Sequence, residues 1–348
     1  MATDDYVTES LRAVLVGCGG MSAAWLRAAK EIPGLELVGL VDVREEAARQ
    51  RAEEFELAGA RLDTDLTRTL EQLRPDAVFD CTVPEAHHSV TLEALRFGCH
   101  VLGEKPLADS MEHAREAVQA AHEAGRIYAV IQNRRYDPRI RRLRRLVASG
   151  GVGALTQANS DFYIGAHFGG FRDRMEHVLL LDMAIHTFDM ARLITGADPV
   201  SVYCREWNPG GSWYDHDASA IAIFEMTGGL IYTYRGSWCA EGLNTSWEAD
   251  WRLVGERGSI TWDGRETIRA QAVSETGGFH STLTDLPVPD PESADRHGGH
   301  GGLIREFVEC VRTGATPETV CSDNIKSLAM VFAAIESSRR NAPVPVAW

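Results

Sequence analysis

The first 132 residues alternate short apolar strands with helical segments, and this alternation limits what the chain can fold into. The predicted strands are 12–16, 36–41, 60–62, 77–81, 99–103 and 127–131, with helices between them. Parallel neighbours need crossover connections, which are right-handed almost without exception. The pattern predicts a doubly wound parallel α/β sheet, which we assign to a first domain of residues 1–132.

Residues 133–348 form a second predicted domain. Strands are expected at 154–164, 200–207, 217–226, 229–238, 249–254 and 258–262, and helices at 138–148, 177–194, 302–312 and 323–340. Glycine turns join several of these strands, as in hairpins. We therefore expect an α+β domain with an open, mainly antiparallel sheet. The Pro- and Gly-rich stretch 285–302 predicts a long loop or lid.

The charge and cysteine content restrict the partners and the compartment. With 35 Lys+Arg against 50 Asp+Glu, the net charge is −15, which argues against nucleic acid as a main partner. The apolar runs are shorter than the ~18 residues of a membrane span, and Met1–Asp5 carry no secretory signal. Seven cysteines without a CxxC pair predict neither a closed disulfide framework nor a zinc knuckle. We expect a cytoplasmic protein.

A glycine-rich turn follows the first predicted strand and opens the first helix, as a dinucleotide-binding fingerprint requires. Gly17 allows a tight turn, Gly19 lets the backbone approach a pyrophosphate, and the helix N-terminus supplies N–H groups and positive dipole. Ser22 stands at the third glycine position and is small enough for close helix–strand packing. The cofactor-binding residues expected in this turn are Gly17, Gly19, Gly20 and Met21.

A carboxylate at the end of the second strand supports the same interpretation. Asp42 lies 25 positions after Gly17, where it can accept hydrogen bonds from the ribose hydroxyls and repel a 2′-phosphate. Arg44 is close enough to weaken the repulsion of a 2′-phosphate. We expect NAD as the cofactor rather than NADP, with Asp42 and Arg44 as cofactor-binding residues.

Two further loops should border the cofactor, because ligands of open α/β sheets bind beyond the carboxyl ends of the strands. The first supplies Thr82, Pro84 and His87 as cofactor-binding candidates. His87 either touches the cofactor or caps the next helix, and the sequence leaves both open. The second loop supplies Glu104 and Lys105.

Lysine is rare in this chain, which makes each lysine worth considering. Only Lys30, Lys105 and Lys326 are lysines among the 35 basic residues. Arginine keeps its proton in proteins, whereas lysine can release one, so Lys105 beside a nicotinamide can shuttle a proton. Lys30 and Lys326 are expected to be solvated. Arg134, just after the sixth strand, is expected to reach cofactor or substrate.

The predicted helix 177–194 carries three polar residues on an apolar background. Asp182, His186 and Asp189 follow i, i+4, i+7 spacing and should share one face. They either form a satisfied core network or line a pocket, and we favour the pocket. Six of the eight tryptophans lie between 207 and 262; most should be core, with one or two stacking on a sugar face.

In this order, the motifs resemble the glucose–fructose oxidoreductase / inositol dehydrogenase / rhizopine-catabolism (Gfo/Idh/MocA) family over essentially the whole chain. The resemblance is carried by the N-terminal fingerprint, the Glu-Lys-Pro at 104–106 and the Asp182-x-x-x-His186 helix. It implies a dinucleotide-binding domain at 1–132 and a substrate-binding and oligomerisation domain at 133–348. It also implies homodimers or homotetramers built through the C-terminal sheet, and Lys105, Asp182 and His186 around the reacting carbon. Many members have a glycine-rich stretch where this chain has residues 175–181.

The expected function is oxidation of a ring secondary alcohol in a sugar, glycoside or inositol, with hydride transfer to NAD. Lys105 and His186 are the expected proton-transfer pair, with His186 as general base, and Asp182 orients His186. The main alternative is an NAD-retaining lyase, glycosidase or epimerase that acts through transient ring oxidation. A nucleotide-binding regulator and a divalent-metal site are further alternatives, although we expect no metal. The metal alternative would use Glu176, His177, Asp182, His186 or His167.

Overall fold

The computed structural model describes residues 10–348, apart from the side chain of Arg296, and it divides into two compact units. The first unit contains the chain up to Asn133 and residues 297–325, and the second contains 134–296 and 326–348. The sequence analysis assigned 297–325 to the second domain. In the structure, helix α8 (Gly299–Thr313) of this segment packs against α1 (Ser22–Lys30) of the first unit.

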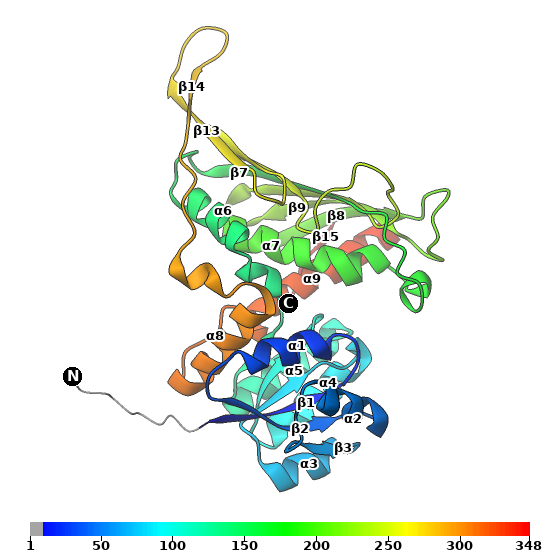
Figure 1. The fold of residues 1–348 in the computed structure, drawn as a ribbon. Coiled ribbons are helices and arrows are strands. Elements are labelled where there is room, and N and C mark those ends of the chain that lie inside the picture. The colour runs from blue at the N-terminus through cyan, green and yellow to red at the C-terminus, as the bar shows by residue number, and fades with distance from the viewer. Residues whose placement is uncertain (1–9) are drawn as a thin grey trace, which may run out of the picture. The chain divides into compact units, whose positions relative to one another are not determined.

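The sheet of the first unit has six parallel strands in the order β3-β2-β1-β4-β5-β6 (Figure 1). The strands are β1 (Leu11–Val16), β2 (Leu35–Val41), β3 (Arg61–Asp63), β4 (Ala77–Asp80), β5 (His100–Gly103) and β6 (Tyr128–Val130). The other helices that connect them are α2 (Glu45–Glu54), α3 (Leu66–Leu73), α4 (Pro84–Arg96) and α5 (Met111–Ala124). The strand order reverses between β1 and β4, which confirms the predicted Rossmann-like sheet.

Burial and capping explain why these segments form these elements. All four residues of β4 are buried, as expected for a strand in a parallel sheet with covered faces. The side chain of Ser110 accepts a hydrogen bond from the His113 backbone N–H and so caps α5, which ends at Gly125 in the left-handed conformation. Val16 pairs with Val41 and with Asp80, so the residues after these strands share one sheet edge.

The sheet of the second unit has nine strands in the order β14-β13-β12-β11-β7-β10-β9-β8-β15 (Figure 1). The strands are β7 (Leu155–Tyr163), β8 (Pro199–Trp207), β9 (Ser219–Met226), β10 (Ile231–Ser237), β11 (Asp250–Gly255), β12 (Gly258–Trp262), β13 (Ile268–Glu275), β14 (Thr282–Asp285) and β15 (Val344–Pro345). β7 and β10 pair in parallel, whereas the other neighbours are antiparallel, so the predicted mainly antiparallel sheet is confirmed. β13, β14 and β15 were not predicted; all four residues of β14 are exposed and show no apolar alternation.

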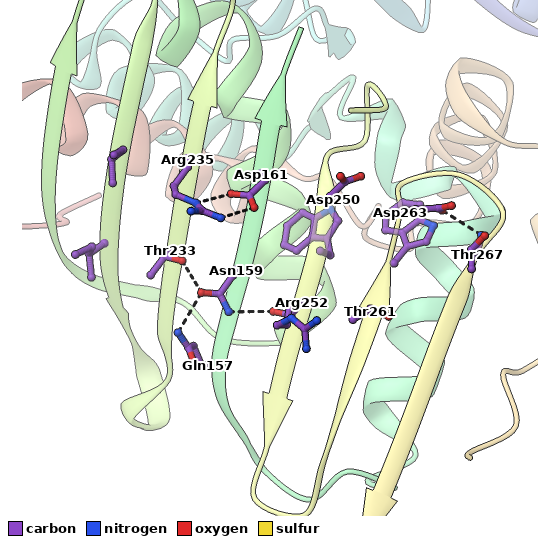
Figure 2. A pocket seen from close by; sticks show the side chains of 14 residues that line it. Gln157, Asn159, Asp161, Thr233, Arg235, Asp250, Arg252, Thr261, Asp263 and Thr267 are labelled. Atoms are coloured by element: carbon purple, nitrogen blue, oxygen red, sulfur yellow. Dashed lines mark hydrogen bonds and ion pairs between the residues drawn. The ribbon is translucent and has the colours of Figure 1, made fainter. Parts of the chain in front are cut away.

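The two faces of this sheet have different surroundings. On the inner face, the Phe188 ring of α7 (Ile185–Thr195) meets the rings of Phe224 and Tyr234 edge-on at 5.0 and 5.2 Å. The outer face carries alternate residues of β7, β9 and β10 around a hollow of about 750 Å³ (Figure 2). Asp161 and Arg235 form an ion pair there. Exposed Ile221 and Ile223 line the same hollow.

The remaining elements correct two predictions. The helix expected at 177–194 consists of a π-helical turn, η3 (Leu179–Ala184), followed by α7. The expected loop 285–302 contains the short 3₁₀ helix η5 (Ser293–Arg296) and the start of α8. The other elements are η1 (Asn133–Tyr136), α6 (Pro138–Ala148), η2 (Arg172–Arg174), η4 (Thr227–Gly229) and α9 (Cys321–Arg340).

Two findings concern the predicted partners and compartment. Among residues 10–348, no helix is both long and apolar enough to cross a membrane. All seven cysteines are free thiols, and all but Cys239 are buried. The residues Met1–Asp5, from which we inferred the absence of a secretory signal, lie outside the described part of the chain.

Candidate functional site

The turn after β1 requires glycine at its first position. Gly17 has a φ of +90°, and a Cβ placed there would lie 2.6 Å from the carbonyl carbon and oxygen of Cys81 and 2.7 Å from the Thr82 nitrogen. The turn therefore packs directly against the chain that leaves β4, at the point where the strand order reverses. This is the crevice where open α/β sheets bind their ligands.

The rest of the turn is open in a way that fits a dinucleotide. A Cβ at Gly19 or Gly20 would meet nothing within 4 Å, so the backbone faces free space that a pyrophosphate can fill. Met21 precedes α1, is 48% exposed, and makes no side-chain cap to the helix. The N–H groups of the first turn of α1 can therefore serve an anion.

An arginine that the sequence analysis missed braces this turn from α2. The Arg51 guanidinium donates to the carbonyl oxygen of Gly19 and to the hydroxyl oxygen of Ser22, both at 3.0 Å. The Ser22 hydroxyl donates in turn to the Gly19 carbonyl at 2.6 Å. Ser22 thus contributes both the small size predicted at this position and a hydrogen bond that holds the turn. Arg51 carries no sequence signal, because it is one charged residue on a highly charged helix.

Asp42 also stabilises the turn. Its carboxylate accepts hydrogen bonds from the backbone N–H groups of Cys18 and Arg44, both at 2.8 Å. A carboxylate offers about four lone pairs, so acceptor capacity remains for ribose hydroxyls. The Arg44 side chain is 75% exposed and its Nε lies 3.9 Å from the Asp42 carboxylate.

The last residue of β4, Asp80, is a buried carboxylate that the sequence did not single out. Asp80 accepts hydrogen bonds from the Thr82 backbone N–H at 3.0 Å and from its hydroxyl at 2.5 Å. The other oxygen of Asp80 has no hydrogen-bond partner within the described residues. Burial raises the pKa of Asp80, and the positive potential of His87 opposes this rise. A charged residue that ends an apolar strand, as Asp42 does, was the available signal. The loop after β4 ends at Pro84, the first residue of α4.

His87 connects the two loops at this sheet edge. Its ring is buried; Nδ1 lies 2.7 Å from the carbonyl oxygen of Pro106 and Nε2 lies 3.2 Å from that of Thr82. His87 therefore braces the loop that contains Lys105 against the loop after β4.

Glu104 holds the same loop from the other side. Its buried carboxylate accepts hydrogen bonds from the indole N–H of Trp25 at 2.8 Å and from the Lys105 backbone N–H at 3.1 Å. His300, at the start of α8, lies 4.0 Å away. Burial acts to raise the pKa of Glu104, but His300, Trp25 and the Lys105 charge outweigh burial and lower it. The half-buried Lys105 is thus carried by a loop fixed on both sides.

In the second unit, Asp189 belongs to a core network and not to a pocket. Its carboxylate pairs with the Arg135 guanidinium at 2.6 and 2.7 Å and accepts the Ser327 hydroxyl at 2.7 Å. Asp189 and Arg135 are both buried. Lys326, expected to be solvated, instead forms an ion pair with Asp198 at 2.6 Å.

Asp182 and His186 have different surroundings from Asp189. The Asp182 carboxylate pairs with Arg172 at 2.8 Å, and His186 is half-buried near the start of α7. A π-helical turn contains more residues than an α-helical turn, so it changes which side chains share a face. The three-residue stripe predicted for one uniform helix is therefore split.

Arg134 contacts two segments of the second unit. Its guanidinium donates to the backbone carbonyl of Trp247 and lies 3.4 Å from the sulfur of Met183. Met183 is the residue after Asp182 in η3. Arg134 thereby ties the segment around Trp247 to the helix that carries Asp182.

A third cluster in the second unit has the spacing of a metal site. Within the described residues, the possible ligand atoms of His177, Glu206 and Asp217 lie within 4.8 Å of one another. Of the residues in the metal alternative, this cluster includes His177 alone. His177 already forms a 2.9 Å ion pair with the buried Glu206, and the Arg339 guanidinium lies 3.4 Å from its Nε2. The hydrogen bond with Glu206 raises the pKa of His177, and burial raises that of Glu206. We assign these residues a structural role.

Comparisons with known proteins agree with this geometry. The family model described as "Oxidoreductase family, NAD-binding Rossmann fold" matches residues 11–132, and the "GFO/IDH/MocA C-terminal domain" model matches residues 140–261. The chain is 26% identical to the D-apiose dehydrogenase of Paraburkholderia graminis, over 97% of this chain and 90% of that protein. It is 28% identical to the scyllo-inositol 2-dehydrogenase (NAD(+)) of Bacillus subtilis, over 90% and 89%.

A solved structure shows the same fold. An oxidoreductase from Agrobacterium radiobacter, in complex with NAD+, L-tartaric acid and magnesium, superposes with a TM-score of 0.83 at 21% identity, covering 97% of this chain and 98% of that one. The two family models together span most of the described residues. The chain therefore belongs to the Gfo/Idh/MocA family of NAD-binding oxidoreductases.

Proposed function

We propose that this protein is an NAD-dependent dehydrogenase that oxidises a ring secondary alcohol of a sugar, glycoside or inositol. The observation that carries the proposal is the braced loop of Lys105. His87 and Glu104 fix this loop at the same sheet edge as the glycine turn. A rigid loop holds a proton-transfer group in position beside a cofactor, which is a large part of what catalysis requires.

The residues divide the chemistry as follows. Bound NAD would accept a hydride from the carbon that carries the hydroxyl. His186 removes the hydroxyl proton as general base, and Lys105 polarises the oxygen and relays the proton. Asp182 orients His186 and binds a neighbouring hydroxyl. A positioned base typically contributes 10²–10⁴-fold to the rate.

The preference for NAD over NADP is part of the proposal. Asp42 places a carboxylate at the end of β2, held by the Cys18 and Arg44 N–H groups. A 2′-phosphate would meet this negative charge, although the exposed Arg44 side chain weakens the repulsion. We expect the Kd for NADP to exceed that for NAD, and replacement of Asp42 by Asn to narrow the difference. Calorimetric titration of both cofactors measures this directly.

The decisive experiment replaces Lys105 by Arg, which keeps the positive charge but cannot release a proton. We expect kcat to fall by about 10²–10⁴-fold with an unchanged Kd for NAD. The substrates are a panel of monosaccharides, glycosides and inositols, scored by nicotinamide reduction with NAD and NADP in parallel. Near-normal kcat in the variant would show that the role given to Lys105 is wrong. Turnover without net NADH would instead indicate the lyase, glycosidase or epimerase alternative.

We also propose that the outer face of the nine-stranded sheet joins copies of the chain into a homodimer or homotetramer. This face exposes Ile221 and Ile223, and Ile221 lies opposite Arg235 in the strand register. Arg235 forms an ion pair with Asp161 on the same face (Figure 2). An exposed apolar patch rimmed by polar groups is typical of an interface. Replacement of Ile223 by Glu should convert the assembly to monomers in light scattering coupled to gel filtration. A wild-type protein that is monomeric would contradict the proposal.

A further inference from the structure

A cluster of exposed aromatic side chains lies in the second unit and has no role in the chemistry above. Phe168 and Trp247 are each 46% exposed. Their rings lie 6.4 Å apart, and both pack against the buried Trp238, at 5.5 and 5.7 Å. The two exposed rings therefore form a supported aromatic surface, which we call the Phe168–Trp247 platform.

The platform is connected to Asp182 on two sides. On one side, the Arg172 guanidinium lies 5.0 Å from the Phe168 ring centre and pairs with the Asp182 carboxylate at 2.8 Å. On the other side, Arg134 donates to the carbonyl of Trp247 and contacts Met183, the residue next to Asp182. Two separate series of contacts, one through Arg172 and one through Arg134, thus hold the platform beside the carboxylate of Asp182.

The segment before Phe168 is also anchored, so its ring has a defined place. The carbonyl of Ala166 accepts hydrogen bonds from the indole of Trp213 at 3.1 Å and the hydroxyl of Tyr214 at 2.7 Å. The ring of His167 stacks on Trp213 with centres 3.7 Å apart. An exposed ring held this firmly is organised for a ligand before the ligand binds.

Ring chemistry identifies the ligand that suits such a surface. An aromatic face carries partial negative charge and attracts the partially positive hydrogens of C–H groups. A six-membered ring with equatorial hydroxyls presents only axial C–H groups on its faces and its hydroxyls at its rim. An axial hydroxyl interrupts that apolar face. Polar groups at the rim suit Asp182 and Arg172, whereas the face suits Phe168 and Trp247.

We propose that the Phe168–Trp247 platform stacks on one face of a pyranose or cyclohexane polyol and selects rings with equatorial hydroxyls. This inference rests on the proposed function and narrows its substrate class. Phe168 and Trp247 act as specificity-determining residues, while Arg172 is a positioning residue that holds the Asp182 carboxylate. Stacking of this kind is worth about two- to tenfold in affinity per ring.

The test compares methyl β-D-glucopyranoside with methyl β-D-gulopyranoside, whose two axial hydroxyls, at C3 and C4, interrupt both ring faces. The variants are Phe168→Leu, Trp247→Leu and the conservative Trp247→Phe. Phe279→Leu is the matched control, because Phe279 is a 95% exposed phenylalanine of the same unit, on the β13–β14 hairpin. Nicotinamide reduction gives KM and kcat, and intrinsic tryptophan fluorescence gives equilibrium binding without turnover. Thermal melting confirms that each variant folds.

Wild type should favour the glucoside, with a fluorescence change on binding. Phe168→Leu and Trp247→Leu should raise the KM and Kd for the glucoside by about two- to tenfold, while those for the guloside change less. Trp247→Phe should retain most of the wild-type preference for the glucoside, and Phe279→Leu should match wild type. Unchanged preference in both leucine variants would overturn the platform and leave the dehydrogenase proposal intact. Glycoside binding without nicotinamide reduction by any member of the substrate panel would refute the dehydrogenase and keep the platform. A wild-type protein that binds neither glycoside would overturn the platform, whatever the panel shows.

Discussion

Two glycines of one turn should respond to alanine in opposite ways, and this contrast tests the assignment of the cofactor site. At Gly17 the added Cβ would overlap the Cys81 carbonyl at 2.6 Å, in a backbone conformation with φ +90°. The left-handed conformation costs about 1–2 kcal/mol for a residue with a Cβ, and overpacking costs about 1–3 kcal/mol. Together they lower the stability of the first unit by about 2–5 kcal/mol. At Gly19 the Cβ meets nothing within 4 Å.

For Gly17→Ala, the stability loss corresponds to a fall in Tm of about 5–15 °C for a unit of this size. For Gly19→Ala, the free energy of unfolding should change by no more than about 1 kcal/mol, because only chain entropy is affected. The same methyl group would keep the pyrophosphate from the backbone N–H groups. Losing one such charge-assisted hydrogen bond costs about 1.5–3 kcal/mol, which raises the Kd for NAD by about 10- to 150-fold.

The assay pairs a thermal melt followed by circular dichroism with calorimetric titration of NAD for each variant. The expected pattern is a destabilised Gly17→Ala and a stable Gly19→Ala that binds NAD poorly. A Gly19→Ala protein with the wild-type Kd for NAD would refute the placement of the pyrophosphate at this turn. A Gly17→Ala protein that melts within about 2 °C of wild type would show that the turn relaxes more easily than its packing implies.

Three further outcomes are expected. Asp189→Asn should destabilise the second unit by about 3–5 kcal/mol in urea unfolding, because it removes the negative charge that pairs with the buried Arg135 guanidinium. A loss below about 1 kcal/mol would contradict the core-network assignment. The pKa of His177 is raised in the folded protein, chiefly by Glu206, so its contribution to stability is complete below pH ~6.5 and is lost as the pH rises through the folded pKa. The Tm difference between wild type and His177→Asn should therefore be larger at pH 6 than at pH 8.5, and equal differences would exclude the linkage. Arg51→Met should weaken NAD binding severalfold in titration, because Arg51 supports the Gly19 carbonyl. The Tm should change little, because the Arg51 side chain is partly exposed. An unchanged Kd for NAD would show that Arg51 does not belong to the site.

Much of the first unit follows from local signals. Most of its strands are short, mainly apolar runs, each strand is separated from the next by a helix, and the glycine turn directly follows β1. The edge that carries Asp42, Glu104 and Lys105 also follows, because parallel strands in register end together. These features depend on neighbours in sequence and on general rules of sheet topology, so the sequence was enough to predict them.

The contacts that hold the site were decided by the tertiary structure. Arg51 reaches Gly19 from α2, and Arg172 reaches Asp182 from η2, a 3₁₀ helix too short to show a periodic pattern. Such pairs join residues whose closeness arises only after the elements pack, so no local pattern marks them.

The helix with Asp182 shows most clearly where the sequence reaches its limit. Its residues were read with a constant 3.6-residue period, which puts Asp182 and Asp189 on one face. The amino-acid sequence by itself determined that this segment is helical and mostly apolar, and that three of its positions carry polar side chains. Whether one turn widens to a π-helix depends on how the helix packs against the sheet. In the packed structure, Asp182 pairs with Arg172, whereas Asp189 is buried against Arg135.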